Sequence, residues 1–142
     1  MKTNSLLQSE EPKSVVYSCS GCSDAGELAD RVARQLTKQG LGKMSCLAGI
    51  GGRVKPLMMT AQKAQRIVVV DGCPLNCARH TLLNAGFKEF QHIALHDLGH
   101  RKGSCPVTDE RVATATAAAA ELIIKAEAAI PAAENEPPKV QS

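Results

Sequence analysis

The sequence predicts an α/β fold: a three-layer αβα sandwich around a mainly parallel four-stranded sheet, with Rossmann-like or flavodoxin-like topology. Two observations predict this fold. Short apolar segments rich in β-branched residues alternate with longer segments whose apolar residues recur at helical spacing. The spacing leaves room for one helix between consecutive strands, which is typical of right-handed βαβ units. At 142 residues, the chain is long enough for one such domain and too short for two.

Four apolar segments are expected to form strands. Their ranges are 15–19, 43–47, 66–71 and 90–95. The third is the clearest, because four consecutive β-branched residues indicate a strand that is buried on both faces of a parallel sheet. The fourth is weaker because His92 and His96 interrupt it. The glycine loop at 49–52 lacks the residues of a phosphate-binding loop, so we interpret it as backbone that passes close to a site.

Four helices are expected between and after these strands. Their ranges are 24–40, 56–65, 74–86 and 109–126. Asp24 and Glu27 form a capping box at the first helix, and Thr108 caps the fourth. Pro56 and Pro74 suit the first helical position of the second and third. The inner face of the fourth helix is expected to contain Val112, Ala115, Ala119, Leu122, Ile123 and Ala126.

The organisation of the chain predicts one domain between two tails. The domain is expected at 14–130. Residues 1–13 are polar and aperiodic, and residues 131–142 are charged and rich in proline, so both segments are expected to be disordered. No apolar run approaches the roughly 20 residues that cross a bilayer, and the N-terminus lacks the features of a signal peptide. We therefore expect a cytoplasmic protein that has no membrane partner.

Composition narrows the classes of function. Aromatic residues make up 2% of the chain, which argues against a nucleic-acid surface that stacks bases. The net charge of +3 comes from Lys and Arg scattered along the chain rather than from a basic arm. Nucleic acid is therefore not an expected partner.

Cysteines follow the ends of the expected strands. Cys19 and Cys22 follow the first strand, Cys46 lies near the end of the second, and Cys73 and Cys77 follow the third. Ligand sites in parallel sheets lie beyond the carboxyl ends of the strands, so we expect these thiols to gather at one edge. In a reducing cytoplasm, such a cluster binds metal or carries out thiol chemistry rather than forming structural disulfides.

Several neighbouring residues have two interpretations. Cys22 and Cys105 are either additional thiols of the site or small buried apolar residues. Asp71 either orients a ligand or forms only a strand-end turn, and we favour the turn. His96 and His100 are interpreted as surface or loop residues rather than ligands.

The helix that Pro74 opens would place Cys73 at the cap position. There the helix dipole and unpaired N–H groups stabilise a thiolate, which both a metal and an electrophile require. Cap position alone therefore does not separate metal binding from redox chemistry.

Three motifs resemble the zinc-binding DGC-domain family, named for its Asp-Gly-Cys triplet. They are Tyr-Ser-Cys-Ser-Gly at 17–21, Cys-Leu-Ala-Gly-Ile-Gly at 46–51 and Asp-Gly-Cys-Pro-x-x-Cys-Ala at 71–78. The resemblance covers roughly 15–99 and has the three motifs in order. It implies a zinc site formed by Cys19, Cys46, Cys73 and Cys77. It leaves the biochemical role undefined.

Three functions are compatible with these observations. The first is a non-enzymatic protein that holds zinc, because a site of four thiolates is usually closed and structural. The second is a thiol redox or sulfur-transfer enzyme in which Cys73 or Cys22 is a nucleophile of low pKa. The third is an iron–sulfur cluster on the same four cysteines. We favour the first, so a metal ion is the expected partner.

Overall fold

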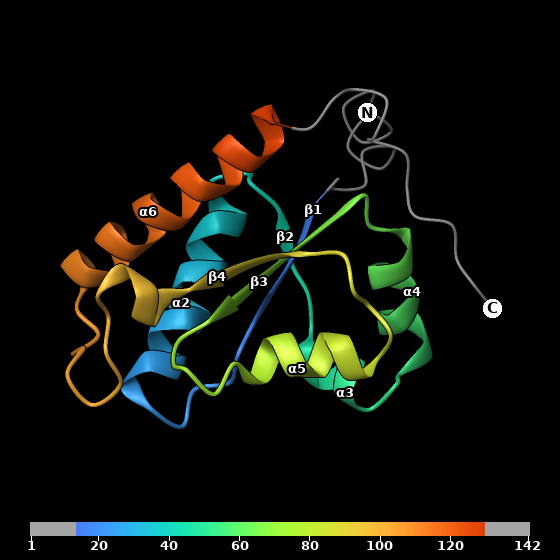
Figure 1. Cartoon of the computed structure of the whole chain (residues 1–142), viewed down its shortest axis with the longest axis horizontal. Helices are drawn as coiled ribbons and strands as arrows, with labels where there is room; N and C mark the ends of the chain where they lie inside the picture. Colours follow the sequence, from blue (N-terminus) through green and yellow to red (C-terminus); the bar gives the residue numbers. More distant parts are fainter. Residues whose placement is uncertain (1–13, 130–142) are drawn as a thin grey trace, which may run out of the picture.

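A four-stranded sheet in the order β2-β1-β3-β4 forms the centre of the computed structural model, which describes residues 14–129 (Figure 1). The strands are β1 (Ser14–Ser18), β2 (Lys43–Met44), β3 (Arg66–Asp71) and β4 (Gln91–Ala94). All three pairings are parallel. The predicted α/β sandwich is thereby confirmed, and the strand order is that of a flavodoxin-like sheet. Both predicted tails lie outside the described residues.

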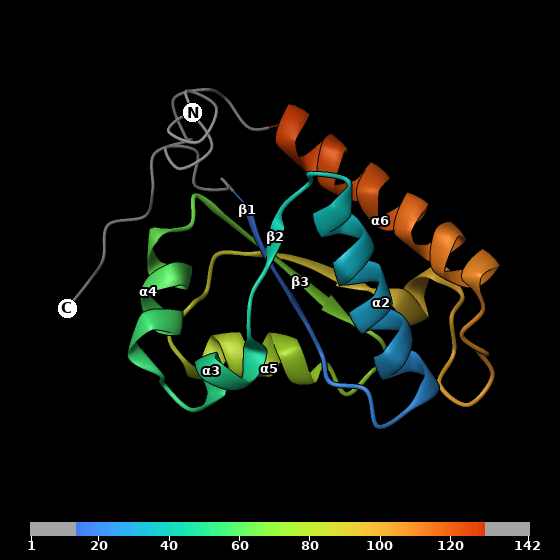
Figure 2. The ribbon, with the colours of Figure 1, turned by 180° about the vertical axis from the view of Figure 1, so that it is seen from behind.

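Helices cover both faces of this sheet (Figures 1 and 2). On one face lie α2 (Asp24–Lys38) and α6 (Asp109–Ala128). On the other lie α3 (Leu47–Gly51), α4 (Lys55–Lys63) and α5 (Cys77–Asn84). The division follows from chain direction: the step from β1 to β2 and the later steps run in opposite directions across the sheet, so right-handed crossovers put their helices on opposite faces. A short 3-10 turn, η1 (Leu95–Leu98), follows β4.

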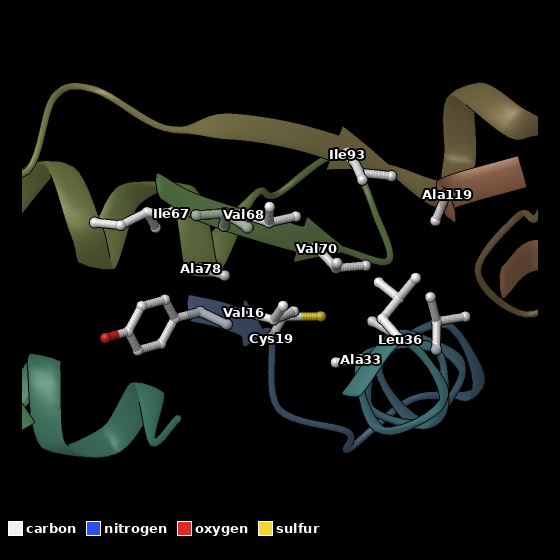
Figure 3. Close-up of a cluster of buried hydrophobic side chains, with 14 of the residues drawn as sticks. Val16, Cys19, Ala33, Leu36, Ile67, Val68, Val70, Ala78, Ile93 and Ala119 are labelled. Atoms are coloured by element: carbon white, nitrogen blue, oxygen red, sulfur yellow. The ribbon is translucent and has the colours of Figure 1, made fainter. Parts of the chain in front are cut away.

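The core is aliphatic and centres on β1 and β3. Val16, Val68 and Val70 are fully buried, as the β-branched run predicts. Figure 3 shows them with Ile93 on the side of the sheet that Leu36 of α2 covers. Cys19 belongs to the same buried cluster, so this thiol is part of the core as well as of the strand-end group.

The start of α2 differs from the prediction. The cap is Ser23, whose hydroxyl accepts a hydrogen bond from the Gly26 N–H at 3.1 Å. Asp24 is already helical, so the capping box predicted for Asp24 and Glu27 is wrong. Glu27 instead pairs with Arg31 one turn later, at 3.6 Å. A serine directly before an aspartate offers two possible caps, and the sequence does not choose between them.

Two further element assignments are wrong. The strand predicted at 43–47 ends at Met44, and most of the predicted glycine loop is the short helix α3. In α6, Leu122 is 38% exposed, whereas the buried stripe runs through Val112, Ala115, Thr116, Ala119 and Ile123. Spacing of three and four residues along that stripe leaves Leu122 beside it rather than on it.

Across residues 14–129, no helix combines the length and apolar character needed to cross a membrane.

Candidate thiol site

The thiols lie where the topology of the sheet opens a crevice. After β1 the chain turns to α2 on one face, and after β3 it turns to α5 on the other (Figures 1 and 2). Connections that leave adjacent strands toward opposite faces create a switch point, and parallel sheets bind ligands at that place. Cys19 follows β1 directly, and Cys73 and Cys77 lie in the connection that follows β3.

Cys19 extends β1 beside β3. Its N–H donates to the Val70 carbonyl at 3.0 Å, and its Sγ accepts a hydrogen bond from the Gly72 N–H at 3.3 Å. Burial is the main cause that raises the pKa of this thiol to about 11. The Gly72 N–H opposes the rise, while negative charge on Asp71, Cys73 and Cys77 adds to it. Cys19 is therefore a protonated, sheltered thiol with two other thiols within electrostatic range.

Gly72 makes this contact possible. A Cβ at this position would overlap the carbonyl of Ala25 in the first turn of α2. Glycine thus lets the end of β3 lie directly against the start of α2, and its N–H reaches the Cys19 sulfur.

The connection from Cys73 to Cys77 is a turn before the helix rather than its first turn. The Asn76 N–H donates to the Cys73 carbonyl at 3.2 Å, and α5 begins at Cys77. The predictions that Pro74 opens this helix and that Cys73 caps it are therefore wrong. Asn76 takes the cap position with a left-handed backbone, φ 53°, and its buried side-chain oxygen has no hydrogen-bond partner within the described residues. Cys73 is half-buried and Cys77 is exposed.

Asp71 explains the late start of α5. Its carboxylate accepts hydrogen bonds from the N–H groups of Ala78 at 2.8 Å and Arg79 at 3.0 Å, which are the orphan donors of the first turn. The same carboxylate lies 2.9 Å from Nε2 of His92 in β4. The interpretation of Asp71 as only a turn former is wrong, because this buried side chain joins β3, α5 and β4.

These contacts stabilise the ionised form of the Asp71 carboxyl. Burial alone would raise the pKa of the carboxyl, but hydrogen bonds from His92, Ala78 and Arg79 outweigh burial and leave its pKa below the ordinary value. Nothing in the sequence spacing links His92 to Asp71. The only signal is strand register, which sets Val69 opposite His92 and so puts the histidine on the same face of the sheet as Asp71.

Cys46 occupies a different local environment. It caps α3, and its Sγ accepts a hydrogen bond from the Gly49 N–H at 3.4 Å. Burial raises the pKa of the neighbouring Tyr17, and negative charge on Cys46 adds to the rise. The Tyr17 hydroxyl is buried and has no hydrogen-bond partner among the described residues. The nearby Ser45 lowers the pKa of Tyr17, but burial outweighs this effect.

Two contacts fix α3, and therefore Cys46, in place. A Cβ at Gly49 would overlap the side chain of Leu57, so helices α3 and α4 are in close contact there. The Arg53 guanidinium donates to the carbonyls of Ile50 at 2.7 Å and Asn84 at 2.8 Å, which ties α3 to the end of α5. A shift of Cys46 together with α3 would therefore disturb the contact with α4 at Gly49 and the bonds that Arg53 makes.

The remaining two cysteines do not belong to one group. Cys22 is exposed in the turn before α2. Cys105 is fully buried, and its N–H donates to Asp24 at 3.2 Å, while the Gly103 N–H donates to the same carboxylate at 2.8 Å. Burial, followed by the charge of Asp24, raises the pKa of Cys105. Cys105 therefore anchors the loop before α6 to the start of α2.

The residue types at the strand ends suit a zinc ion, but their positions do not yet form a zinc site. Thiols at strand ends that receive backbone N–H bonds are the donors zinc prefers. Yet within residues 14–129, no three Cys, His, Asp or Glu side chains converge as metal ligands. The positions described here therefore do not form a closed tetrahedral site.

Comparisons with known proteins give a family and a relative. The model of the DGC domain matches residues 15–120. A Pseudomonas aeruginosa protein named anaerobic and virulence modulator AnvM is 38% identical over 93 residues, which span 66% of this chain and 71% of that protein. No solved structure gives a significant match to the chain.

Proposed function

Since the chain belongs to the DGC-domain family, we propose that it binds zinc through the cysteines beyond β1 and β3. The observation that carries the proposal is the placement of Cys19 within electrostatic range of Cys73 and Cys77, at the switch point of the sheet. Residues more than 50 positions apart are brought together there by strand pairing, and all three thiols are free. Free thiols grouped at a strand-end crevice are available to bind a metal, which packing of the aliphatic core does not explain.

The surrounding residues would act on the thiols rather than on a substrate. The Gly72 N–H points at the Cys19 sulfur and would stabilise the thiolate that zinc requires. Asp71 holds the first turn of α5, and with it Cys77, against the end of β3. Because the pKa of Cys19 is about 11, zinc binding at neutral pH would release its proton, so affinity should fall as the pH is lowered.

Cys46 is the fourth donor that the family resemblance implies. To reach a zinc ion held at the switch point, its sulfur would exchange the Gly49 N–H for the metal. We infer that zinc uptake is coupled to a shift of α3, in the way that metal binding is commonly coupled to folding of the site. The name of the Pseudomonas relative describes a modulator rather than a reaction, which agrees with a binding role.

Elemental analysis after anaerobic purification and dialysis against zinc tests the proposal. We expect about one zinc per chain for the wild type and loss of that zinc in the Cys73→Ser/Cys77→Ser variant. Cys22→Ser is the matched control, because this thiol is exposed and lies outside the proposed set; it should keep its zinc. Unchanged zinc in the double variant, or no uptake by the wild type, would refute the proposal. Iron with inorganic sulfide in place of zinc would indicate a cluster instead.

Thiol redox chemistry is the second candidate, favoured by free thiols that lie at the same end of the sheet without converging as metal ligands within residues 14–129. In this reaction two thiols form one disulfide, and two electrons and two protons pass to glutathione disulfide, which becomes two glutathione molecules. Treatment of metal-free protein should then remove two titratable thiols without adding glutathione mass. If all six thiols persist, this candidate fails.

A further inference from the structure

A hollow lies between α4 and the edge of the sheet, beside β2. It has a volume of about 410 Å³, and Val15 of β1 and Ala64 form its buried apolar part. Leu57 and Met59 of α4 line another side. A volume of this size is within the range of sites that take small molecules.

The helix that borders the hollow is poorly buried. In α4 only Ala61 is buried, although the helix also carries Leu57, Met58 and Met59. Met59 is 49% exposed. A surface helix normally covers its apolar side chains by packing them on the sheet. Here part of that apolar surface faces the hollow instead, so a ligand with an apolar body would complete the burial.

The charge around the hollow is positive. Lys43 of β2 and Lys63 of α4 both line it, and none of the lining residues within 14–129 is acidic. None of the ion pairs formed within residues 14–129 involves either lysine. Two ammonium groups without an ion-pair partner in the described part of the chain, beside an apolar surface, favour a ligand that carries a negative charge at one end.

The backbone at this edge favours a small ligand over an added peptide strand. The Met44 N–H donates to the Thr37 hydroxyl at 3.0 Å, and the Ser45 N–H donates to the Val16 carbonyl at 2.9 Å. Strand addition relies on free main-chain donors along the edge. The Ser45 bond faces into the sheet and the Met44 donor is taken by Thr37, so neither N–H is free to pair with an added strand, and recognition by side chains is favoured.

We propose that this hollow binds a small organic carboxylate with an aliphatic body, the carboxylate lying between Lys43 and Lys63 and the chain lying against Leu57 and Val15. The site is separate from Cys19, Cys73 and Cys77, which follow β1 and β3, because it lies at the outer edge of the sheet next to α4. It adjoins Cys46 through Ser45, which lines it. Its occupancy requires neither zinc nor a reduced thiol.

Octanoate is the probe for the test, added to full-length, isotopically labelled protein and followed by titration calorimetry and amide chemical shifts. We expect saturable binding with a Kd of about 0.1–1 mM, the range for a ligand of this size, with shifts centred on Met44, Thr60 and Ala64. Octanol, which lacks the charge, and acetate, which lacks the chain, should each bind at least about tenfold more weakly.

Two variants separate the proposal from nonspecific attraction. Lys43→Glu/Lys63→Glu should weaken octanoate at least about tenfold, while the matched control Lys88→Glu/Lys102→Glu, at exposed lysines outside the lining, should bind as the wild type does. Thr60→Trp, which fills the hollow from an exposed helical position, should abolish binding with little effect on stability. Equal binding of octanoate and octanol, an equal loss in the control, or shifts away from the hollow would overturn the proposal.

Discussion

Replacement of Asp71 by Asn tests whether its carboxylate organises the thiol site. The carboxylate accepts hydrogen bonds from two helix N–H groups and contacts His92, and the residue is only 1% exposed. Asn keeps one acceptor oxygen and presents an NH2 group to one of the two amides. A hydrogen bond to a charged acceptor is worth about 1.5–3 kcal/mol, and relief of the buried charge offsets part of the loss. We expect Asp71→Asn to lower the free energy of unfolding by ~2 kcal/mol, with a fall in melting temperature on the order of 10 °C.

Urea unfolding followed by circular dichroism, on metal-free reduced protein, measures this change. Asp97→Asn is the matched control: that side chain is 74% exposed, and its ion pair within residues 14–129 is with the neighbouring His96, so its effect should stay within about 0.5 kcal/mol. If Asp71→Asn also stays within about 0.5 kcal/mol of the wild type, the carboxylate does not organise the site.

The pH dependence provides a second check on Asp71. Its pKa in the folded protein is lower than the ordinary value of about 3.9. A group of this kind stabilises the fold fully above its unfolded pKa, and the stabilisation is lost as the pH falls through the folded pKa. The stability difference between wild type and Asp71→Asn should therefore be smaller below about pH 4 than at about pH 5. A difference that grows on acidification would contradict the assigned sign.

Two further predictions concern the residues around this carboxylate. Gly72→Ala should cost at least about 2 kcal/mol in urea unfolding, because its Cβ would overlap the Ala25 carbonyl, whereas Gly51→Ala, whose Cβ meets only open space and one methyl at 3.8 Å, should change stability by less than about 0.5 kcal/mol. Equal effects would show that the close approach at Gly72 is not limiting. Cys19, buried and with a pKa of about 11, should react with iodoacetamide at pH 7.5 far more slowly than exposed Cys22, as read by peptide mass spectrometry; equal rates would contradict its burial.

The sheet could be predicted from the sequence because its signal is dense and local. Four consecutive β-branched residues in β3 have few alternatives to a buried parallel strand, and all four are buried. Boundaries failed where two residues compete for one role. Ser23 and Asp24 are both good caps, and the contact between the Ser23 hydroxyl and Gly26 decides between them only in three dimensions.

The thiol site was harder to predict because its contacts run between elements. Strand ends alone place Cys19 near Cys73, and negative charge on Cys73 does contribute to the pKa of Cys19. The position of Cys77 at the first residue of α5 depends on Asp71, whose helix-capping contacts span seven and eight residues. The contact with His92 spans 21 residues and follows from strand register alone. No local pattern encodes a contact of that length.

The Asp-Gly-Cys triplet illustrates how one short motif serves three neighbours. Asp71 points to the layer of α5 and fixes the start of that helix, while Gly72 faces α2 and donates its N–H to Cys19. Both residues make contacts that hold elements of the fold together, so we expect substitutions at either position to lower the stability of the protein. Cys73 is half-buried, and its thiol has no hydrogen bond among the described residues. The first two residues of the triplet therefore hold the chain at the switch point of the sheet, where Cys73 follows them.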